Sequence, residues 1–186
     1  MTYSSDKKIS IIFCFFITAF VLAYSFKVKT ERYFNNPLED LLKELPDSTL
    51  KTLAGKNIDL RSFRTGKKGL VVHFWGTWCA PCEIELPSLL KMIDRFNNED
   101  VDFLLIAVRD DVFKIQKFFK KFNNISSDHL KLVLDENGET MAKFGTFKLP
   151  ETYIFDKNGY MKKKFVGPQD WDNSYFKNQI QYLLNP

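Results

Sequence analysis

Two cysteines, Cys79 and Cys82, are the residues of this sequence whose spacing most directly indicates chemistry. They follow a continuous apolar run at residues 70–75, which predicts a strand buried on both faces. Apolar residues at helical spacing from Leu86 to Phe96 predict a helix that begins at the pair. The first turn of a helix has unpaired N–H groups and a partial positive charge, which together lower the pKa of a cysteine thiol. We therefore expect Cys79 to face solvent at the helix start, Cys82 to lie one turn in, and the pair to perform thiol–disulfide exchange.

The composition excludes several other function classes. The chain has 186 residues, of which 45% are hydrophobic, and this suits one domain with an additional segment. Its net charge is only +4 and its lysines are scattered, so no nucleic-acid-binding surface is expected. Its two histidines, His73 and His129, lack the spacing of metal ligands, and we expect neither a metal nor a cofactor.

The N-terminal part contains an almost unbroken apolar run at residues 9–26, preceded by two lysines. Its length is at the lower end of the about 17–25 residues that a membrane-spanning helix needs. The lysines favour a cytoplasmic N-terminus at residues 1–8, with the remainder on the periplasmic or extracytoplasmic side of the cytoplasmic membrane. The run is therefore expected to be a membrane anchor. A cleaved signal peptide is the alternative, because residues 23–25 resemble a small-x-small cleavage site.

After the apolar run, the sequence divides into a linker with a short helix at residues 27–49 and a domain at residues 50–186. Leucines at helical spacing, from Leu38 to Leu45, predict the short helix. Within the domain we expect strands at 57–60, 70–75, 101–108 and 130–134, a hairpin of 152–155 with 163–166, and helices at 112–122, 141–144 and 171–184. This alternation, closed by a hairpin and a last helix, predicts an α/β fold with a mixed sheet.

Several motifs resemble those of one protein family. Trp78-Cys79-Ala80-Pro81-Cys82 after a buried strand is similar to the active site of the thioredoxin fold. Further motifs resemble, in the same order, those of the membrane-anchored TlpA/ResA and CcmG/DsbE-type proteins, at residues 55–60, 72–79, 85–87, 149–159 and Gly167. The resemblance covers roughly residues 50–184. It implies a thioredoxin-like fold, a central mixed β-sheet flanked by helices, with an extra strand–helix insertion at residues 101–124.

The resemblance implies a role for each matching residue. Cys79 is expected to be the nucleophile that forms a mixed disulfide with the substrate, and Cys82 the resolving thiol, so that Cys79–Cys82 is the redox-active disulfide. Pro150 matches the family's cis-proline, which packs beside the cysteines and offers backbone groups to an extended substrate. Trp78 and Glu151 are also expected to contact the substrate.

Three further side chains are considered for proton transfer. Glu85 matches an acidic residue of the family and lies three positions after Cys82, on the same helix face, where it could accept the proton of that thiol. The simpler interpretation is an acid that favours the first turns of a helix. Glu83 competes for the role, but its spacing turns it toward solvent. His73, six residues before Cys79, could relay protons or could be a hydrogen-bonded structural histidine.

The resemblance also implies a function, that of a membrane-tethered thiol–disulfide oxidoreductase acting as a reductant. Its expected substrate is a disulfide in an apocytochrome c haem-binding motif during cytochrome c biogenesis, and its expected electron donor is a membrane carrier of the CcdA/DsbD kind. A general reductase or an oxidase of exported proteins is the alternative within this class, because Ala80-Pro81 between the cysteines does not decide between them. A metallochaperone or binding module on the same fold is the alternative of another class.

Overall fold

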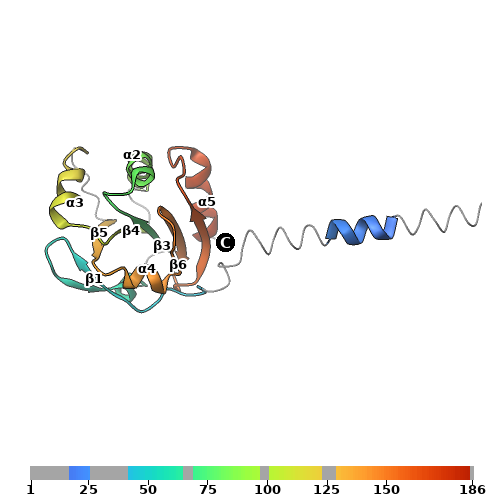
Figure 1. The fold of residues 1–186 in the computed structure, drawn as a ribbon, viewed down its shortest axis with the longest axis horizontal. Coiled ribbons are helices and arrows are strands. Elements are labelled where there is room, and N and C mark those ends of the chain that lie inside the picture. Colours follow the sequence, from blue (N-terminus) through green and yellow to red (C-terminus); the bar gives the residue numbers. More distant parts are fainter. Residues whose placement is uncertain (1–16, 26–41, 65–68, 97–100, 123–128, 185–186) are drawn as a thin grey trace, which may run out of the picture. The chain divides into compact units, whose positions relative to one another are not determined.

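The computed structural model describes residues 17–25, 42–64, 69–96, 101–122 and 129–184. The chain divides into two compact units, residues 1–40 and 41–186. In the first unit residues 17–25 are helical (Figure 1). Within the described ranges, no helix is long and apolar enough to cross a membrane. The expected N-terminal segment 1–8, positions 9–16 and 26 of the expected anchor, and residues 27–41 of the expected linker lie outside the described residues.

A seven-stranded mixed sheet forms the centre of the second unit (Figure 1). Its strands are β1 (Thr49–Thr52), β2 (Asn57–Asp59), β3 (Gly69–Trp75), β4 (Val101–Val108), β5 (Leu130–Asp135), β6 (Glu151–Asp156) and β7 (Met161–Val166), in the spatial order β2-β1-β5-β4-β3-β6-β7. β3, β4 and β5 are parallel, whereas the pairs β3–β6, β6–β7, β1–β5 and β1–β2 are antiparallel. The predicted mixed sheet and its predicted strands are confirmed, and β1 is a strand that the sequence did not predict.

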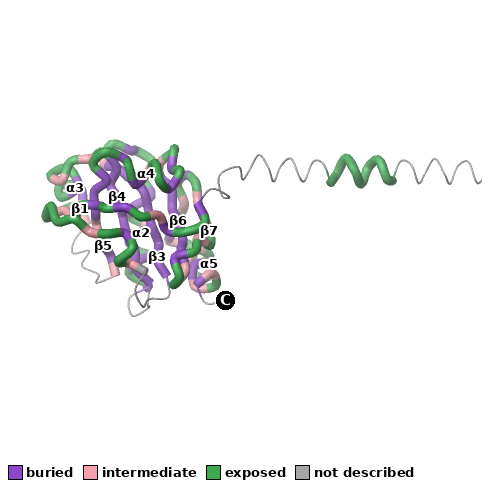
Figure 2. The backbone as a smooth tube through the Cα atoms, turned by 90° about the horizontal axis from the view of Figure 1, so that it is seen from below, coloured by how far each residue is buried: buried purple, intermediate pink, exposed green. Residues whose placement is uncertain are grey.

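The central strands β3 and β4 are buried at every residue, which explains why their sequences are continuous apolar runs (Figure 2). On one face of the sheet lie α2 (Ala80–Asp94), α3 (Val112–Phe119) and α5 (Ser174–Leu184), over a buried cluster that includes Trp75, Leu86 and Trp171 (Figure 1). The short helices α4 (Glu139–Lys143) and η1 (Leu60–Arg64) are the remaining helices of the second unit's described part. A second buried cluster, on the opposite face of the sheet, includes Phe74, Phe144 and Tyr153.

The helix predicted from the leucine spacing is wrong for the part of it that the structure describes, because residues 42–48 contain no helix. This segment instead runs beside the turn between β6 and β7, where Glu44 forms an antiparallel bridge with Tyr160. Leu42 and Leu45 are buried in the second cluster. The apolar side chains therefore cover a sheet face from an extended segment, and three- or four-residue spacing alone could not distinguish this from a helix.

Candidate active site

The two cysteines form a disulfide where β3 gives way to α2. Their Cα atoms are 5.3 Å apart, and Cys79 is the N-cap residue of α2. Pro81 lies in the first turn of the helix, where its missing N–H costs nothing. Cys82 is fully buried and Cys79 is only 6% exposed, because both belong to the cluster between the sheet and α2. The expectation that Cys79 faces solvent is therefore wrong for this disulfide form, although its position at a helix N-terminus favours a thiolate.

The turn between β3 and α2 is attached to the loop that follows β4. The carboxylate of Asp110 accepts hydrogen bonds from the Thr77 N–H at 2.6 Å and from the Thr77 hydroxyl at 2.8 Å. The Trp78 indole N–H donates to the carbonyl of Val108 at 3.0 Å. A Cβ atom on Gly76 would lie only 2.8 Å from the indole nitrogen of Trp78, so glycine lets the ring pack against the turn. Sequence reasoning missed Asp110, because nothing in its local pattern shows a partner 33 residues away.

Trp78 leaves 59% of its surface exposed immediately before Cys79. Its hydrogen bond to β4 fixes the ring in place, so that it presents a rigid apolar surface next to the disulfide. Contact between this ring and the substrate stays a prediction.

Pro150 lies next to the end of β3 from which the cysteine turn departs. Its peptide bond with Leu149 is cis, as the resemblance implied, and the next residue, Glu151, pairs with Phe74 of β3. The carbonyl of Pro150 accepts a hydrogen bond from the Gly167 N–H at 2.9 Å. Among the residues that the structure describes, none pairs with the backbone of Leu149. The backbone before Pro150 is therefore free to pair with an extended polypeptide.

Glu85 is buried on α2, one turn after Cys82 and only 2% exposed. The indole N–H of Trp171 donates to its Oε1, while Oε2 has no hydrogen-bond partner in the described part of the chain. Burial raises the pKa of Glu85 from 4.5 to about 7, although hydrogen bonds from Trp171 and from the backbone of Gln169 partly oppose this rise. A carboxyl group with this pKa can both take up and release a proton near neutral pH.

Glu83, the competing acid, lies on the exposed side of the helix and forms an ion pair with Lys121 at 3.0 Å. Both side chains are about half exposed, so this pair contributes little to stability. The exposed position of Glu83 matches the sequence expectation.

His73 is buried in β3 and only 1% exposed. Its Nδ1 lies 2.9 Å from the hydroxyl of Thr152, the residue opposite it on β6. Burial lowers the pKa of His73 from 6.5 to about 3, so the imidazole stays neutral near pH 7. This geometry favours the structural interpretation of His73 over the proton relay.

Glu151 does not face a substrate, contrary to the expectation. Its side chain is fully buried, and Oε2 accepts hydrogen bonds from the Lys164 ammonium and from the Tyr153 hydroxyl, both at 2.9 Å. The strand alternation points Glu151 to the same face as Tyr153, and a carboxylate buried there needs a cationic partner. Lys164 supplies that charge, which sequence reasoning missed because the lysine belongs to a run of three on an edge strand.

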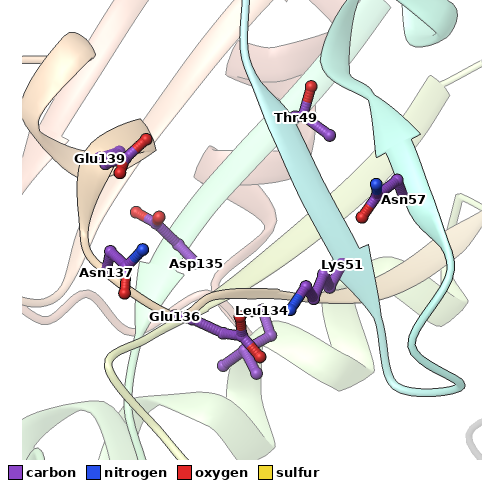
Figure 3. A pocket seen from close by; sticks show the side chains of 8 residues that line it. All are labelled: Thr49, Lys51, Asn57, Leu134, Asp135, Glu136, Asn137 and Glu139. Atoms are coloured by element: carbon purple, nitrogen blue, oxygen red, sulfur yellow. Dashed lines mark hydrogen bonds and ion pairs between the residues drawn. The ribbon is translucent and has the colours of Figure 1, made fainter.

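A separate surface pocket lies toward the β2 edge of the sheet, near β1, β2 and the end of β5 (Figure 3). It is lined mainly by polar side chains, two of which, Lys51 and Glu136, form an ion pair at 2.6 Å. Asp135 is occupied by the N–H groups of Thr140 and Met141 at the start of α4. Neither cysteine lines the pocket, and the described residues contain no group of three His, Cys, Asp or Glu side chains placed to hold a metal ion.

Comparison with known proteins identifies relatives of this chain. A model of the Redoxin family matches residues 42–180. The thiol-disulfide oxidoreductase ResA of Geobacillus thermodenitrificans is 32% identical over 122 residues, which cover 66% of this chain and 67% of the relative. ResA of Bacillus cereus is 28% identical over 127 residues, covering 68% of this chain and 70% of the relative.

Solved structures agree on the fold. A thiol:disulfide interchange protein of the thioredoxin family from Chlorobium tepidum superposes with a TM-score of 0.62 at 22% identity, covering 77% of this chain and 97% of that protein. A secreted Mycobacterium tuberculosis disulfide oxidoreductase homologous to DsbE of E. coli gives a TM-score of 0.58 at 26% identity, with coverages of 73% and 93%. The sheet and its flanking helices therefore form a thioredoxin-like fold.

Proposed function

Because this chain belongs to the Redoxin family and is a thiol–disulfide oxidoreductase of the ResA and DsbE type, we propose that it reduces disulfides in exported proteins. The favoured substrate is the disulfide of an apocytochrome c haem-binding motif, which must be opened before haem can attach. The observation that carries the proposal is the Cys79–Cys82 pair at the N-terminus of α2, with the buried carboxyl of Glu85 one helical turn after Cys82.

The proposed reaction begins with both cysteines reduced. The Cys79 thiolate, favoured by the helix N-terminus, attacks one sulfur of the substrate disulfide, and the other substrate sulfur leaves as a thiolate that takes up a proton. Cys82 then gives its proton to Glu85 and attacks the Cys79 sulfur of the mixed disulfide. The second substrate sulfur leaves as a thiolate and takes up a proton, which Glu85 can return, so the substrate gains two electrons and two protons and becomes a dithiol, while the protein becomes the Cys79–Cys82 disulfide that the structure shows.

The disulfide form must be reduced again before another turnover. A membrane electron carrier of the CcdA/DsbD kind is the proposed donor, and the apolar run at residues 9–26 is the proposed tether that keeps the domain beside it on the outer side of the cytoplasmic membrane. A tether of this kind raises the effective concentration of the two partners. Alkaline extraction of membranes from cells that produce the full chain tests this arrangement: a chain released with the soluble proteins would contradict the anchor and support the cleaved signal peptide.

The reaction is tested with the reduced protein and a peptide disulfide built on a Cys-x-x-Cys-His motif. Between about pH 6 and 9, Glu85→Gln should slow release of the reduced peptide increasingly as pH rises, because the wild-type carboxyl loses its proton around pH 7 and only then accepts the proton of the resolving thiol. Glu83→Gln is the matched control, since this neighbouring carboxylate is exposed and paired with Lys121. Equal rates for the wild type and Glu85→Gln across this range would remove Glu85 from the mechanism.

The alternatives give different outcomes in the same experiments. An oxidase would transfer its disulfide to a reduced peptide faster than it reduces an oxidised one. A metallochaperone would bind copper through the reduced cysteines, so a titration without cysteine-dependent binding excludes it.

A further inference from the structure

The buried ion pair of Glu151 and Lys164 is a costly feature that the reaction described above does not use. The exposed fractions of the two side chains are 0% and 5%, and removing two charges from water costs several kcal/mol per ion before their attraction is counted. The second carboxylate oxygen of Glu151, Oε1, has no hydrogen-bond partner among the described residues. Such a pair is weak evidence for a stabilising role. Its position provides another explanation.

The pair is connected to the segment that precedes Pro150. The Lys164 ammonium lies 5.0 Å from the centre of the Tyr153 ring and 5.6 Å from the centre of the Phe147 ring. Cation–π contacts at these distances are attractive, and more so when the cation is buried. Phe147 itself is 64% exposed, so the buried cation is one of the contacts that keep this aromatic ring against the domain.

Tyr153 continues the network into the same segment. Its hydroxyl lies 2.8 Å from the Thr146 hydroxyl, 3.2 Å from the Phe144 carbonyl and 2.9 Å from Oε2 of Glu151. Burial raises the pKa of Tyr153 far above its ordinary value of 10.0, so the hydroxyl keeps its proton and stays a donor. Lys164 lies directly opposite Tyr153 in the β6–β7 register. Lys164 of β7 therefore contacts Phe147 directly. Tyr153 of β6, which also contacts Lys164, reaches positions 144 and 146.

We propose that Lys164 is a positioning residue, which through Glu151, Tyr153 and Phe147 fixes residues 144–150 so that the free backbone of Leu149 can receive an extended polypeptide disulfide. This inference rests on the proposed reduction of protein disulfides. The network packs on the face of the sheet opposite α2, whereas the cysteines pack on the α2 face. Lys164 therefore governs the capture of polypeptide substrates and leaves the reactivity of Cys79 toward small disulfides unchanged.

The test compares two substrates with the reduced full chain. One is a peptide disulfide long enough to pair with the backbone before Pro150, and the other is the small aromatic disulfide dithiobis(nitrobenzoate), which has no polypeptide backbone. Lys164→Met should lower the rate constant for the peptide about tenfold, the effect of one lost backbone contact, and change that for the small disulfide less than about twofold. Lys162→Met, at an exposed position of the same strand where the lysine makes only a long ion pair with Asp156 at 3.9 Å, should change neither, and Lys164→Arg should restore the peptide rate because it keeps the cation.

A second variant distinguishes the loss of the positioning role from misfolding. Lys164→Met alone leaves an uncompensated buried carboxylate, so the double variant Glu151→Gln/Lys164→Met removes both charges and should fold while showing the same loss for the peptide. Equal loss for both substrates, or equal behaviour of the Lys164 and Lys162 variants, would overturn the positioning role. A wild-type protein that reduces the small disulfide but not the peptide would instead overturn the proposed function, and this inference with it.

Discussion

Replacing Glu85 by glutamine should stabilise the protein at neutral and alkaline pH. The folded protein keeps a proton on Glu85 up to about pH 7, whereas the unfolded chain releases it near 4.5. Because the folded state binds more protons between these values, its free energy of unfolding falls as pH rises, by about 1.36 kcal/mol per pH unit. Over this interval the loss amounts to about 3 kcal/mol. Glutamine does not ionise, and its amide oxygen can still accept the hydrogen bond of Trp171.

Urea denaturation of the oxidised protein at several pH values measures this effect. The variant should be more stable than the wild type by up to about 3 kcal/mol above pH 7, and the difference should shrink toward zero near pH 4.5. Glu83→Gln, the same substitution at an exposed position of the same helix, is the matched control. A difference between wild type and Glu85→Gln that stays constant over the whole range would refute the assignment of a protonated, buried carboxyl to Glu85.

The remaining predictions concern His73, Asp110 and the cysteine turn. His73→Asn should leave the pH–rate profile of disulfide reduction unchanged, because the buried imidazole is neutral in the working range; a shifted profile would restore the proton relay. In the wild type His73 should lower stability as pH falls from 6.5 toward 3, since only the unfolded chain gains a proton there, and acid denaturation of His73→Asn should show a weaker decline. Asp110→Ala should lower the free energy of unfolding, measured by urea denaturation, by about 1–3 kcal/mol, because it removes the acceptor of two hydrogen bonds from Thr77. The same variant should slow alkylation of reduced Cys79. An unchanged alkylation rate would show that this attachment does not orient the turn.

Local sequence patterns were sufficient to predict the buried central strands and the hairpin. The runs at residues 70–75 and 101–108 are apolar without interruption because β3 and β4 are covered on both faces, and no surface helix shows that pattern. The turn residues at 156–159 likewise predicted the hairpin. In contrast, Leu42 and Leu45 pack from an extended segment, and its bridge to Tyr160 joins residues more than a hundred positions apart.

The active site shows the same contrast between features predicted from local sequence and features that depend on distant residues. The spacing of Cys79 and Cys82 and the strand before them placed the disulfide at a helix start, where the structure has it. The environment of each charged group could not be predicted in this way. The local sequence around Glu85 and Glu151 does not show their partners, because Trp171 neighbours the first and Lys164 neutralises the second, 86 and 13 residues away along the chain. Those partners, which the tertiary fold brings together, decide whether an acid can exchange protons or serves to hold a loop.

The reduction potential of the Cys79–Cys82 pair, measured by equilibrating the protein with a dithiol buffer, tests most directly whether this oxidoreductase is a reductant. A value near or below the about −270 mV of thioredoxin is expected, because a reductant must pass electrons to a protein disulfide and end as the disulfide form. A value near the about −120 mV of DsbA would contradict the proposed direction of electron flow and would make the protein an oxidant of exported thiols.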